Sequence, residues 1–461
     1  MTQPTFKKMG GASNSDPSAL RRWATSMLMR RFASLSQRDK QRVRFEKQRQ
    51  RRGEPHRVEY FHQVEDPYSH LSAQVLGRFT DAYDVEFVPH MVGAPPGANA
   101  PEPEMLLPYS QHDCELVASH FGLRFLPGIK PPNRNRIDLA NRVLAGASSS
   151  TFGERAIQVG DALWSNSDQE LDALEIQLGS SSASDAEKQL NDGNARRAEL
   201  GHYSGAMFHY GGEWYWGIDR LYHLEQRLMA LGLRRDGSEQ VLVPRPPVES
   251  GPLRDDGSLT LEFFPSIRSP YSSIIFDRVV ELAEDAGVKM VTRPVLPMVM
   301  RGAPVTFIKG KYIFSDTARE AETLGLPWGH AYDPIGRPVR RAFALFPWAE
   351  EQGKGAALVG HFMRLAWREG VNTDTLKGLR RVVEAAGLDW SDARQRIDDP
   401  AWEAVIESHR TTMYADGLWG VPSYRLLDDD GTSLLSIWGQ DRLWLVSRTI
   451  QATLREQQGG A

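Results

Sequence analysis

The sequence has almost no cysteine and no long apolar segment. Cys114 is the single cysteine among 461 residues, which excludes an intramolecular disulfide, a Cys-x-x-Cys redox pair and a cysteine-rich zinc site. No segment approaches the ~18 consecutive apolar residues of a membrane-spanning helix, and the N-terminus lacks the pattern of a secretory signal. These absences predict a cytoplasmic protein without a membrane span, in which any sulfur chemistry uses a thiol from outside the chain.

Acidic residues are scarce at the start of the chain. Residues 1–56 carry 14 Lys and Arg against four Asp and Glu, a charge of +10, whereas the whole chain carries -4. This basic arm also contains Trp23, Met27, Met29 and Phe32, a mixture that suits nucleic acid or an anionic membrane surface. The alternative is a solvated or partly helical tail that packs on a neighbouring domain or subunit, because runs of charge generally face solvent.

The length of the chain and an internal repeat indicate two domains. With 461 residues the chain exceeds the roughly 250–300 residues at which a single core stops growing. A shift of 203 residues aligns, in order, Glu59-Tyr60-Phe61 with Glu262-Phe263-Phe264, Pro67-Tyr68-Ser69 with Pro270-Tyr271-Ser272, and Tyr109, Asp113 and Trp164 with Tyr312, Asp316 and Trp367. Near the end, a shift of 222 aligns Trp216-Gly217-Ile218-Asp219 with Trp438-Gly439-Gln440-Asp441, so the second copy holds 19 (222 minus 203) extra residues. This ordered series predicts a tandem duplication.

Composition places the boundaries of the repeat. After the basic arm of residues 1–56, copy one spans residues 57–233 and copy two spans residues 258–455. Residues 234–257 between them are rich in proline, glycine and charge, which is typical of an extended linker.

Each copy begins with the pattern of a parallel crossover. Short apolar runs at residues 57–61 and 259–264 predict strands, and a helix that starts with proline follows each one. Second apolar runs at residues 85–91 and 288–295 come after those helices. Strand, helix and strand in this order predict two parallel strands joined by a right-handed connection.

The remainder of copy two predicts helices and then a hairpin. Residues 315–410 show helical spacing, whereas residues 423–427 and 434–438 read as two strands around a turn, followed by a helix at residues 441–454. We therefore expect an α/β protein of two tandem domains, each a mixed sheet with an inserted helical subdomain.

A hydroxyl-containing motif stands where the first strand of copy two meets its helix. In Ser269-Pro270-Tyr271-Ser272 the serine is a favoured N-cap and the proline a favoured first helical residue. The same hydroxyl at the positive end of a helix can also stabilise a thiolate. Copy one has Asp66-Pro67-Tyr68-Ser69, in which the carboxylate caps equally well but raises the pKa of a neighbouring thiol. A thiolate site is therefore predicted in copy two and not in copy one.

Two further segments differ between the copies in the same sense. Lys309-Gly310-Lys311-Tyr312 supplies cations where copy one has Leu106-Leu107-Pro108-Tyr109, and Gly420-Val421-Pro422-Ser423 aligns with Gly205-Ala206-Met207-Phe208. Structural explanations remain open, because a surface lysine is generally solvated and a Val-Pro pair can simply begin a strand.

With these residues in place, copy two resembles a known family. It is similar to the DsbA-like branch of the thioredoxin superfamily, and within it to the group of 2-hydroxychromene-2-carboxylate isomerases and kappa-class glutathione transferases. The similarity rests on the following motifs: Ser269-Pro270-Tyr271-Ser272, Lys309-x-x-Tyr312-x-x-x-Asp316-x-x-Arg319, Gly325-Leu326-Pro327, Gly417-x-x-Gly420-Val421-Pro422 and Trp438-Gly439-Gln440-Asp441-Arg442-Leu443. The resemblance implies two thioredoxin-like domains, of which copy one keeps fewer of the motif residues.

The resemblance also implies a glutathione site. Ser269 takes the place of a redox cysteine and contacts the glutathione sulfur. Val421 offers backbone hydrogen bonds to the glutathione cysteine beside a cis Pro422, and Lys309 lines the pocket.

The γ-glutamyl end of glutathione is implied to bind at Gln440 and Asp441. Copy one retains an aspartate at the matching position, Asp219. Asp441 therefore has an architectural alternative, which is to cap the final helix.

Two classes of function remain open from the sequence. The first is a glutathione-dependent isomerase or transferase that acts on an aromatic-derived or conjugated small molecule, in a chain that can form a homo-oligomer. The second is a binding or scaffold module of the DsbA family without redox cysteines. Histidine spacing predicts no metal site, and Cys114 is expected to be a buried structural thiol. Candidate aromatic residues of a substrate pocket, or of the core, are Phe264, Phe314, Trp328, Phe346 and Trp348.

Overall fold

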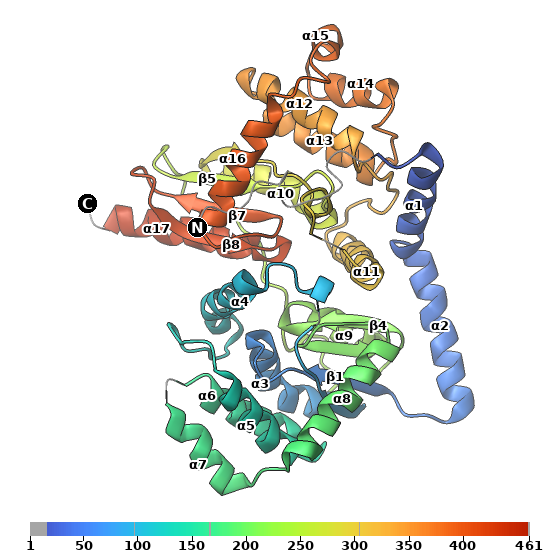
Figure 1. The fold of residues 1–461 in the computed structure, drawn as a ribbon, viewed down its shortest axis with the longest axis vertical. Coiled ribbons are helices and arrows are strands. Elements are labelled where there is room, and N and C mark those ends of the chain that lie inside the picture. The colour runs from blue at the N-terminus through green and yellow to red at the C-terminus, as the bar shows by residue number, and fades with distance from the viewer. Residues whose placement is uncertain (1–15, 96, 166, 304, 460–461) are drawn as a thin grey trace. The chain divides into compact units, whose positions relative to one another are not determined.

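The computed structural model describes residues 16–95, 97–165, 167–303 and 305–459 (Figure 1). The chain divides into two compact units. The N-terminal unit is Arg38–Pro246, and the C-terminal unit combines Pro247–Ala461 with the start of the chain up to Gln37. The basic arm is thus divided between the two units.

The N-terminal unit contains a four-stranded sheet. Its strands are β1 (Arg57–His62), β2 (Glu86–Met91), β3 (Met207–Tyr210) and β4 (Glu213–Trp216), in the order β2-β1-β3-β4. β1 pairs with β2 in parallel and with β3 antiparallel, and β3 pairs antiparallel with β4. Helix α3 (Pro67–Ala82) connects β1 to β2, and α9 (Gly217–Ala230) follows β4.

The C-terminal unit repeats this sheet. β5 (Thr260–Phe264), β6 (Lys289–Thr292), β7 (Ser423–Leu427) and β8 (Ser433–Trp438) have the order β6-β5-β7-β8 and the same relative directions. Helix α10 (Pro270–Ala286) makes the crossover, and the short 3-10 helix Gln440–Arg442 leads into α17 (Leu443–Gly459). The two mixed sheets that the sequence predicts are present, with strand ends within three residues of the predicted ones.

A helical insertion separates the second and third strands of each sheet. In the N-terminal unit it consists of Gly97–Asn99 and Ala118–Phe121 as 3-10 helices, with α4 (Pro103–Val117), α5 (Arg134–Ala145), α6 (Phe152–Leu163), α7 (Asp168–Leu178) and α8 (Ala183–Glu199). In the C-terminal unit it consists of the 3-10 helix Met298–Met300, with α11 (Phe307–Thr323), α12 (Arg337–Glu351), α13 (Gly355–Trp367), α14 (Leu376–Ala385), α15 (Trp390–Arg394) and α16 (Trp402–Ala415). The predicted position of the helical subdomain is confirmed in both copies.

Local chemistry explains why these elements begin and end where they do. β5 is buried over residues 261–264, as in a strand covered on both faces, and its one charged residue, Glu262, is paired with Arg293 and Arg425. Pro270 starts α10 behind its N-cap Ser269, and Gly287 ends it with φ of 72°, a conformation that glycine adopts without steric cost.

Strand register corrects one alignment between the copies. Phe61 pairs with Met207 and Phe264 pairs with Ser423. Because Phe61 and Phe264 are equivalent, Pro422 corresponds to Ala206, one residue from the predicted match. The shift at this point is 216 (422 minus 206), so 13 of the 19 extra residues precede β7 and six lengthen the β7–β8 hairpin, its turn and its strands together.

The described part of the basic arm forms two helices, α1 (Ala19–Phe32) and α2 (Leu35–Arg52). In the predicted linker, residues 234–257, Arg234 forms an isolated antiparallel bridge with Tyr83, and residues 235–257 contain no helix or strand. Among the described helices, none has both the length and the apolar character needed to cross a bilayer.

Candidate functional site

Two of the predicted site segments lie at the same end of the C-terminal sheet. β5 ends at Phe264, which pairs with Ser423 at the start of the antiparallel strand β7. The loop after Phe264 leads to Ser269, and Pro422 immediately precedes Ser423. The N-cap of α10 and the Val421–Pro422 segment therefore leave neighbouring strands at the same end of the sheet.

Ser269 caps α10 and keeps a proton to donate. Its Oγ accepts a hydrogen bond from the backbone N–H of Ser272 at 3.2 Å. This bond uses an oxygen lone pair, so the hydroxyl proton remains available. The described residues provide no acceptor for that proton. Ser269 thus presents a donor at the positive end of a 17-residue helix, a position that favours an anion.

Two hydrogen bonds hold the loop that carries Ser269. The backbone N–H of Ser266 donates to Ser272 Oγ at 3.2 Å. Trp367 Nε1 donates to the Ile267 carbonyl oxygen at 3.0 Å. These bonds fix the loop on α10 and on α13, which pre-organises the serine for a ligand.

A buried ion pair holds the residue before the serine. Arg268 Nε and Nη2 donate to the two carboxylate oxygens of Asp333 at 2.8 and 3.1 Å. Asp333 is 2% exposed, and a bidentate pair of this kind fixes the orientation of both side chains. Sequence reasoning missed Arg268, although copy one has Glu65 at the matching position and the reversal of charge was available as a signal.

The peptide bond between Val421 and Pro422 is cis, as the resemblance implied. Pro422 is buried and Val421 is half-buried. The Pro422 carbonyl accepts a hydrogen bond from Gly439 N at 2.9 Å, and Gly217 N makes the equivalent bond to Ala206 in copy one. This turn is therefore common to both copies, whereas the proline belongs to copy two.

Lys309 lies in the first turn of α11, behind the N-cap Thr306. Burial lowers the pKa of the Lys309 ammonium to about 8. Seven residues later on this helix, Asp316 accepts hydrogen bonds from Tyr271 Oη at 2.8 Å and Arg319 Nη2 at 3.0 Å. The motif that contains Lys309 therefore also ties α11 to the start of α10.

The tyrosine–aspartate bond is architectural, because copy one has it too. Tyr68 Oη donates to Asp113 Oδ2 at 2.8 Å, the distance found for Tyr271 and Asp316. Tyr271 is thus accounted for by the fold. The shared bond separates it from Ser269, for which copy one has a different group.

Gln440 is engaged inside the domain. Its Nε2 donates to Glu320 Oε2 at 2.8 Å, and both side chains are buried. Copy one replaces this polar pair by Val117 and Ile218, which are also buried. The hydrogen bond gives Gln440 an architectural role whether or not it contacts a ligand.

Asp441 has surroundings that copy one shares. Arg442 Nη1 donates to the Asp441 carbonyl at 3.3 Å, and Arg220 Nη1 donates to the Asp219 carbonyl at 3.2 Å. Asp441 is half-buried. The similar geometry of the two copies gives no ligand-specific feature to this residue.

The matching site of copy one is filled by its own side chains. Asp66 accepts hydrogen bonds from the backbone N–H groups of Tyr68 and Ser69 and from Ser69 Oγ at 2.8 Å. Burial raises the pKa of Asp66 to about 6. A Cβ at Gly205, the counterpart of Val421, would lie 2.7 Å from Gln63 Cβ and 3.3 Å from Asp66 Oδ2. Where copy two has a donor, copy one has an acceptor and little space.

The predicted aromatic residues fall into two classes. Phe264 and Phe346 are in the core, at 0% and 2% exposure. Phe314 and Trp328 pack with Trp367, and the half-buried Trp328 donates from Nε1 to Ser273 Oγ at 2.8 Å. Trp328 therefore stands beside the first turn of α10.

Trp348 and Cys114, which the sequence also singled out, lie outside this site. Trp348 is half-buried, with the Arg396 guanidinium 5.4 Å from its ring centre. Cys114 is fully buried, as expected of a structural thiol. The described residues contain no group of three or more His, Cys, Asp or Glu side chains that could hold a metal ion.

Comparison with known proteins agrees with this geometry. Residues 260–451 match the sequence model of the family described as "DSBA-like thioredoxin domain". This part of the chain is therefore a DsbA-like thioredoxin domain, and the predicted fold class of thioredoxin-like domains is confirmed. The match covers copy two and fewer than half of all residues.

Several solved structures resemble single domains of the chain. A 2-hydroxychromene-2-carboxylate isomerase is 21% identical over 44% of this chain and 99% of its own, with a TM-score of 0.38. A probable DsbA oxidoreductase from Streptomyces coelicolor is 17% identical over 42% and 90%, with a TM-score of 0.33. The cytosolic disulfide reductase DsbM from Pseudomonas aeruginosa, solved with GSH, is 17% identical over 43% and 98%, with a TM-score of 0.33.

TM-scores this low leave the activities of those proteins without bearing on this chain. No curated protein matches it significantly.

Proposed function

We propose that the DsbA-like thioredoxin domain of residues 260–451 binds glutathione and supports a glutathione-dependent isomerisation or transfer on an aromatic-derived or conjugated small molecule. The observation that carries the proposal is the hydroxyl proton of Ser269, which has no acceptor among the described residues and stands at the N-terminus of α10. A donor placed there stabilises a thiolate and lowers its pKa. The chain has no cysteine in this domain, so the thiol comes from the ligand.

In this proposal each predicted site residue contacts a different part of glutathione. Ser269 donates to the sulfur, and the backbone of Val421 beside cis Pro422 pairs with the cysteine residue of the tripeptide. Lys309 balances a carboxylate of the anionic ligand. When bound, glutathione supplies a nucleophile that adds to a conjugated carbon and departs after bond rotation, or that is transferred to an electrophile.

The outer end of glutathione is assigned to Gln440 and Asp441. The buried hydrogen bond from Gln440 to Glu320 fixes the start of the Gln440–Arg442 turn against α11. This bond orients Gln440 for the γ-glutamyl end of the ligand. A reducing cytoplasm, in which glutathione is mostly the thiol, suits the whole scheme.

We propose a non-catalytic, scaffolding role for copy one. Asp66 has no proton to donate when ionised, and Gln63 and Asp66 crowd the backbone at Gly205. A thiolate bound here would be repelled by the Asp66 carboxylate and would clash with the Gln63 side chain.

Calorimetric titration with glutathione, together with ultraviolet titration of the bound thiolate, tests the proposal. We expect the full chain to bind one glutathione and to lower the thiol pKa by about one unit or more. Ser269→Ala should still bind the peptide but lose most of this shift, because the donor is absent.

Asp66→Ala provides the matched control at the same helix position of copy one. We expect it to leave affinity and thiol pKa unchanged. Absence of glutathione binding in the wild-type chain contradicts the proposal, as does a thiol pKa that Ser269→Ala leaves unaltered.

A further inference from the structure

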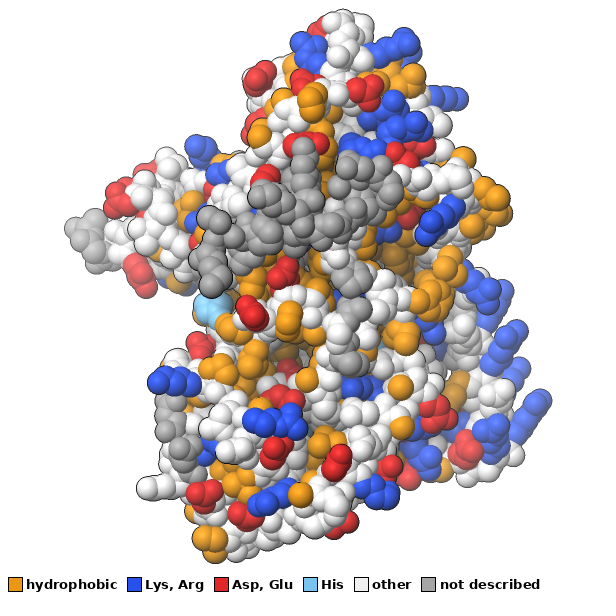
Figure 2. All heavy atoms as spheres, in the orientation of Figure 1, with side chains coloured by type: hydrophobic (Ala, Val, Ile, Leu, Met, Phe, Trp, Pro, Cys, Tyr) orange, Lys and Arg blue, Asp and Glu red, His pale blue; other side chains and the backbone are white. Residues whose placement is uncertain are grey.

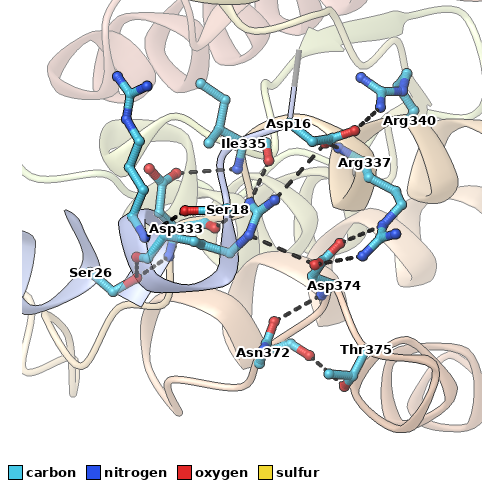
Figure 3. A network of polar contacts seen from close by, with 12 residues as sticks. Asp16, Ser18, Ser26, Asp333, Ile335, Arg337, Arg340, Asn372, Asp374 and Thr375 are labelled. Atoms are coloured by element: carbon cyan, nitrogen blue, oxygen red, sulfur yellow. Dashed lines mark hydrogen bonds and ion pairs between the residues drawn. The ribbon is translucent and has the colours of Figure 1, made fainter. Parts of the chain in front are cut away.

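Helix α1 packs on the C-terminal unit through its polar face. Arg22 is 1% exposed, and its Nη1 donates to the carbonyl oxygens of Asp333, at 3.0 Å, and Ile335. Ser26 Oγ accepts from Asp333 N at 2.9 Å (Figure 3). A buried guanidinium that binds backbone carbonyls gives the helix one rotational setting.

Other contacts on the same side support this setting. Arg30 Nε donates to the Ala331 carbonyl at 2.9 Å. Before the helix, Asp16 bonds to Arg337 N and to the Arg340 guanidinium (Figure 3). The helix is therefore attached along its length to the segment between α11 and α12.

This attachment buries Met29 but turns four other apolar side chains of α1 outward. Leu20, Trp23, Met27 and Leu28 are 73%, 54%, 44% and 39% exposed. Their spacing of three and four residues places them on one face of the helix. The space-filling view shows hydrophobic side chains gathered over α1 (Figure 2). A helix of a globular protein ordinarily buries such a face, and an exposed apolar face of this kind indicates an interaction surface.

The charge on this face has one sign. No aspartate or glutamate occurs between Pro17 and Arg38. Arg21 and Arg31 are exposed, whereas Arg22 is turned inward. The outward face thus combines apolar side chains with cations alone.

We propose that this α1 face, formed by Leu20, Arg21, Trp23, Met27, Leu28 and Arg31, docks on the surface of an anionic lipid bilayer. Tryptophan and aliphatic side chains enter the interfacial region of a bilayer, and flanking arginines meet anionic headgroups. A second copy of the same face would bring Arg21 and Arg31 against their own counterparts, which like-charge repulsion opposes. A nucleic acid would use the cations but leave the apolar stripe in water.

This surface is distinct from the glutathione site, although the opposite side of α1 supports the segment around Asp333. It uses no residue assigned to glutathione, and failure of either proposal leaves the other standing.

Co-sedimentation of the full chain with vesicles tests the proposal. We expect partition onto phosphatidylcholine vesicles that contain phosphatidylglycerol to exceed partition onto pure phosphatidylcholine by about tenfold at low salt. The double variant Trp23→Ser with Met27→Ser should lose about tenfold in partition. Because both side chains are exposed, circular dichroism should show an unchanged fold.

Ile176→Ser is the matched control, since Ile176 is 87% exposed on α7 and should not alter partition. Arg21→Glu with Arg31→Glu should remove the preference for the anionic vesicles. Two outcomes overturn the proposal. The first is no vesicle binding, in which case a dimer or an RNA complex that the Trp23 and Met27 substitutions abolish identifies another partner. The second is vesicle binding that survives those substitutions.

Discussion

Ser269 and Asp66 occupy the same N-cap in the two copies, but only the serine hydroxyl has a proton to give. Both residues satisfy the first backbone N–H groups of their helices, so the requirements of the fold do not distinguish them. The neighbouring position reverses charge, from Glu65 to Arg268. The chemistry of the site is therefore set by single side chains on a shared backbone.

Ser269→Asp converts the site of copy two to that of copy one. Because aspartate caps α3 in copy one, we expect thermal stability to change by less than about 1 kcal/mol. Glutathione turnover should fall by about 100-fold or more, since a carboxylate replaces the donor to the thiolate. Thermal melting and steady-state rates measure the two effects. Loss of the fold together with the activity would contradict this separation.

If Lys309 lines the proposed glutathione site, binding of the anionic ligand should depend on pH. Burial lowers the Lys309 pKa to about 8 in the free protein, so the side chain is cationic below that pH and neutral above it. Affinity should therefore fall as pH rises through about 8. Titration with S-methylglutathione, which has no thiol to ionise, isolates this effect. Lys309→Met should bind several-fold more weakly at pH 7 and with a flat profile; an unchanged profile excludes the role.

Asp66 makes the N-terminal unit sensitive to acid in the opposite sense to most carboxylates. Burial raises the Asp66 pKa to about 6 from an ordinary value of 3.8, so the folded state binds the proton more tightly. Stability conferred by this group is then greatest below about pH 4 and decreases as pH rises to about 6. Asp66→Asn should remove about 3 kcal/mol of this dependence, measured by hydrogen exchange in α3. A slope that persists in the variant would assign it elsewhere.

Among the helices, α1 connects the start of the chain to the proposed site. Its buried Arg22 and Ser26 hold the segment around Asp333, and Asp333 holds Arg268 beside the proposed catalytic serine. Continuous contacts therefore join the start of the chain to Ser269 within the C-terminal unit. This makes α1 part of the support of the site.

Arg22→Ala should loosen the segment between α11 and α12. The substitution removes a buried donor from two carbonyl groups, at a cost of about 2 kcal/mol. We expect faster hydrogen exchange in residues 325–336 and weaker glutathione binding. Arg21→Ala, one residue away on the exposed side, is the control and should change neither. Equal effects of the two substitutions would show that charge, not position, matters.

At the scale of the whole molecule, the compact units do not follow the order of the chain. The C-terminal unit takes in the segment up to Gln37, although some 200 residues of the other unit intervene. A fragment cut at the proline-rich segment would lack α1. The unit is complete only with both pieces.

Residues 247–461 alone should therefore be less stable than the same unit in the full chain. We expect a lower melting temperature for the fragment and recovery when a peptide of residues 16–37 is added, since binding to the native state stabilises it. A peptide with Arg22→Ala is the control and should restore less. A fragment as stable as the full chain would refute the assignment of α1 to this unit.

Much of the fold was predictable because its signals are local. Apolar runs marked β1 and β5, and the proline after a capping residue marked α3 and α10. Comparison of the two copies supported each predicted element. It also distinguished Ser269, Lys309 and Pro422, which differ between the copies, from the residues that both copies share. The alignment slipped by one residue at Pro422, because the sequence alone does not reveal which residues pair across a sheet.

The sequence by itself determined two sheets with helical insertions, the absence of a redox cysteine pair and the serine at a helix N-terminus, since periodicity, capping and composition act over a few residues. Only the tertiary structure decided what lies around that serine. Arg268 meets Asp333 across 65 positions, Gln440 meets Glu320 across 120, and Arg22 meets Asp333 across 311. Such contacts depend on the packing of distant elements, where the cost of burying a charge is met by a partner that no local pattern identifies.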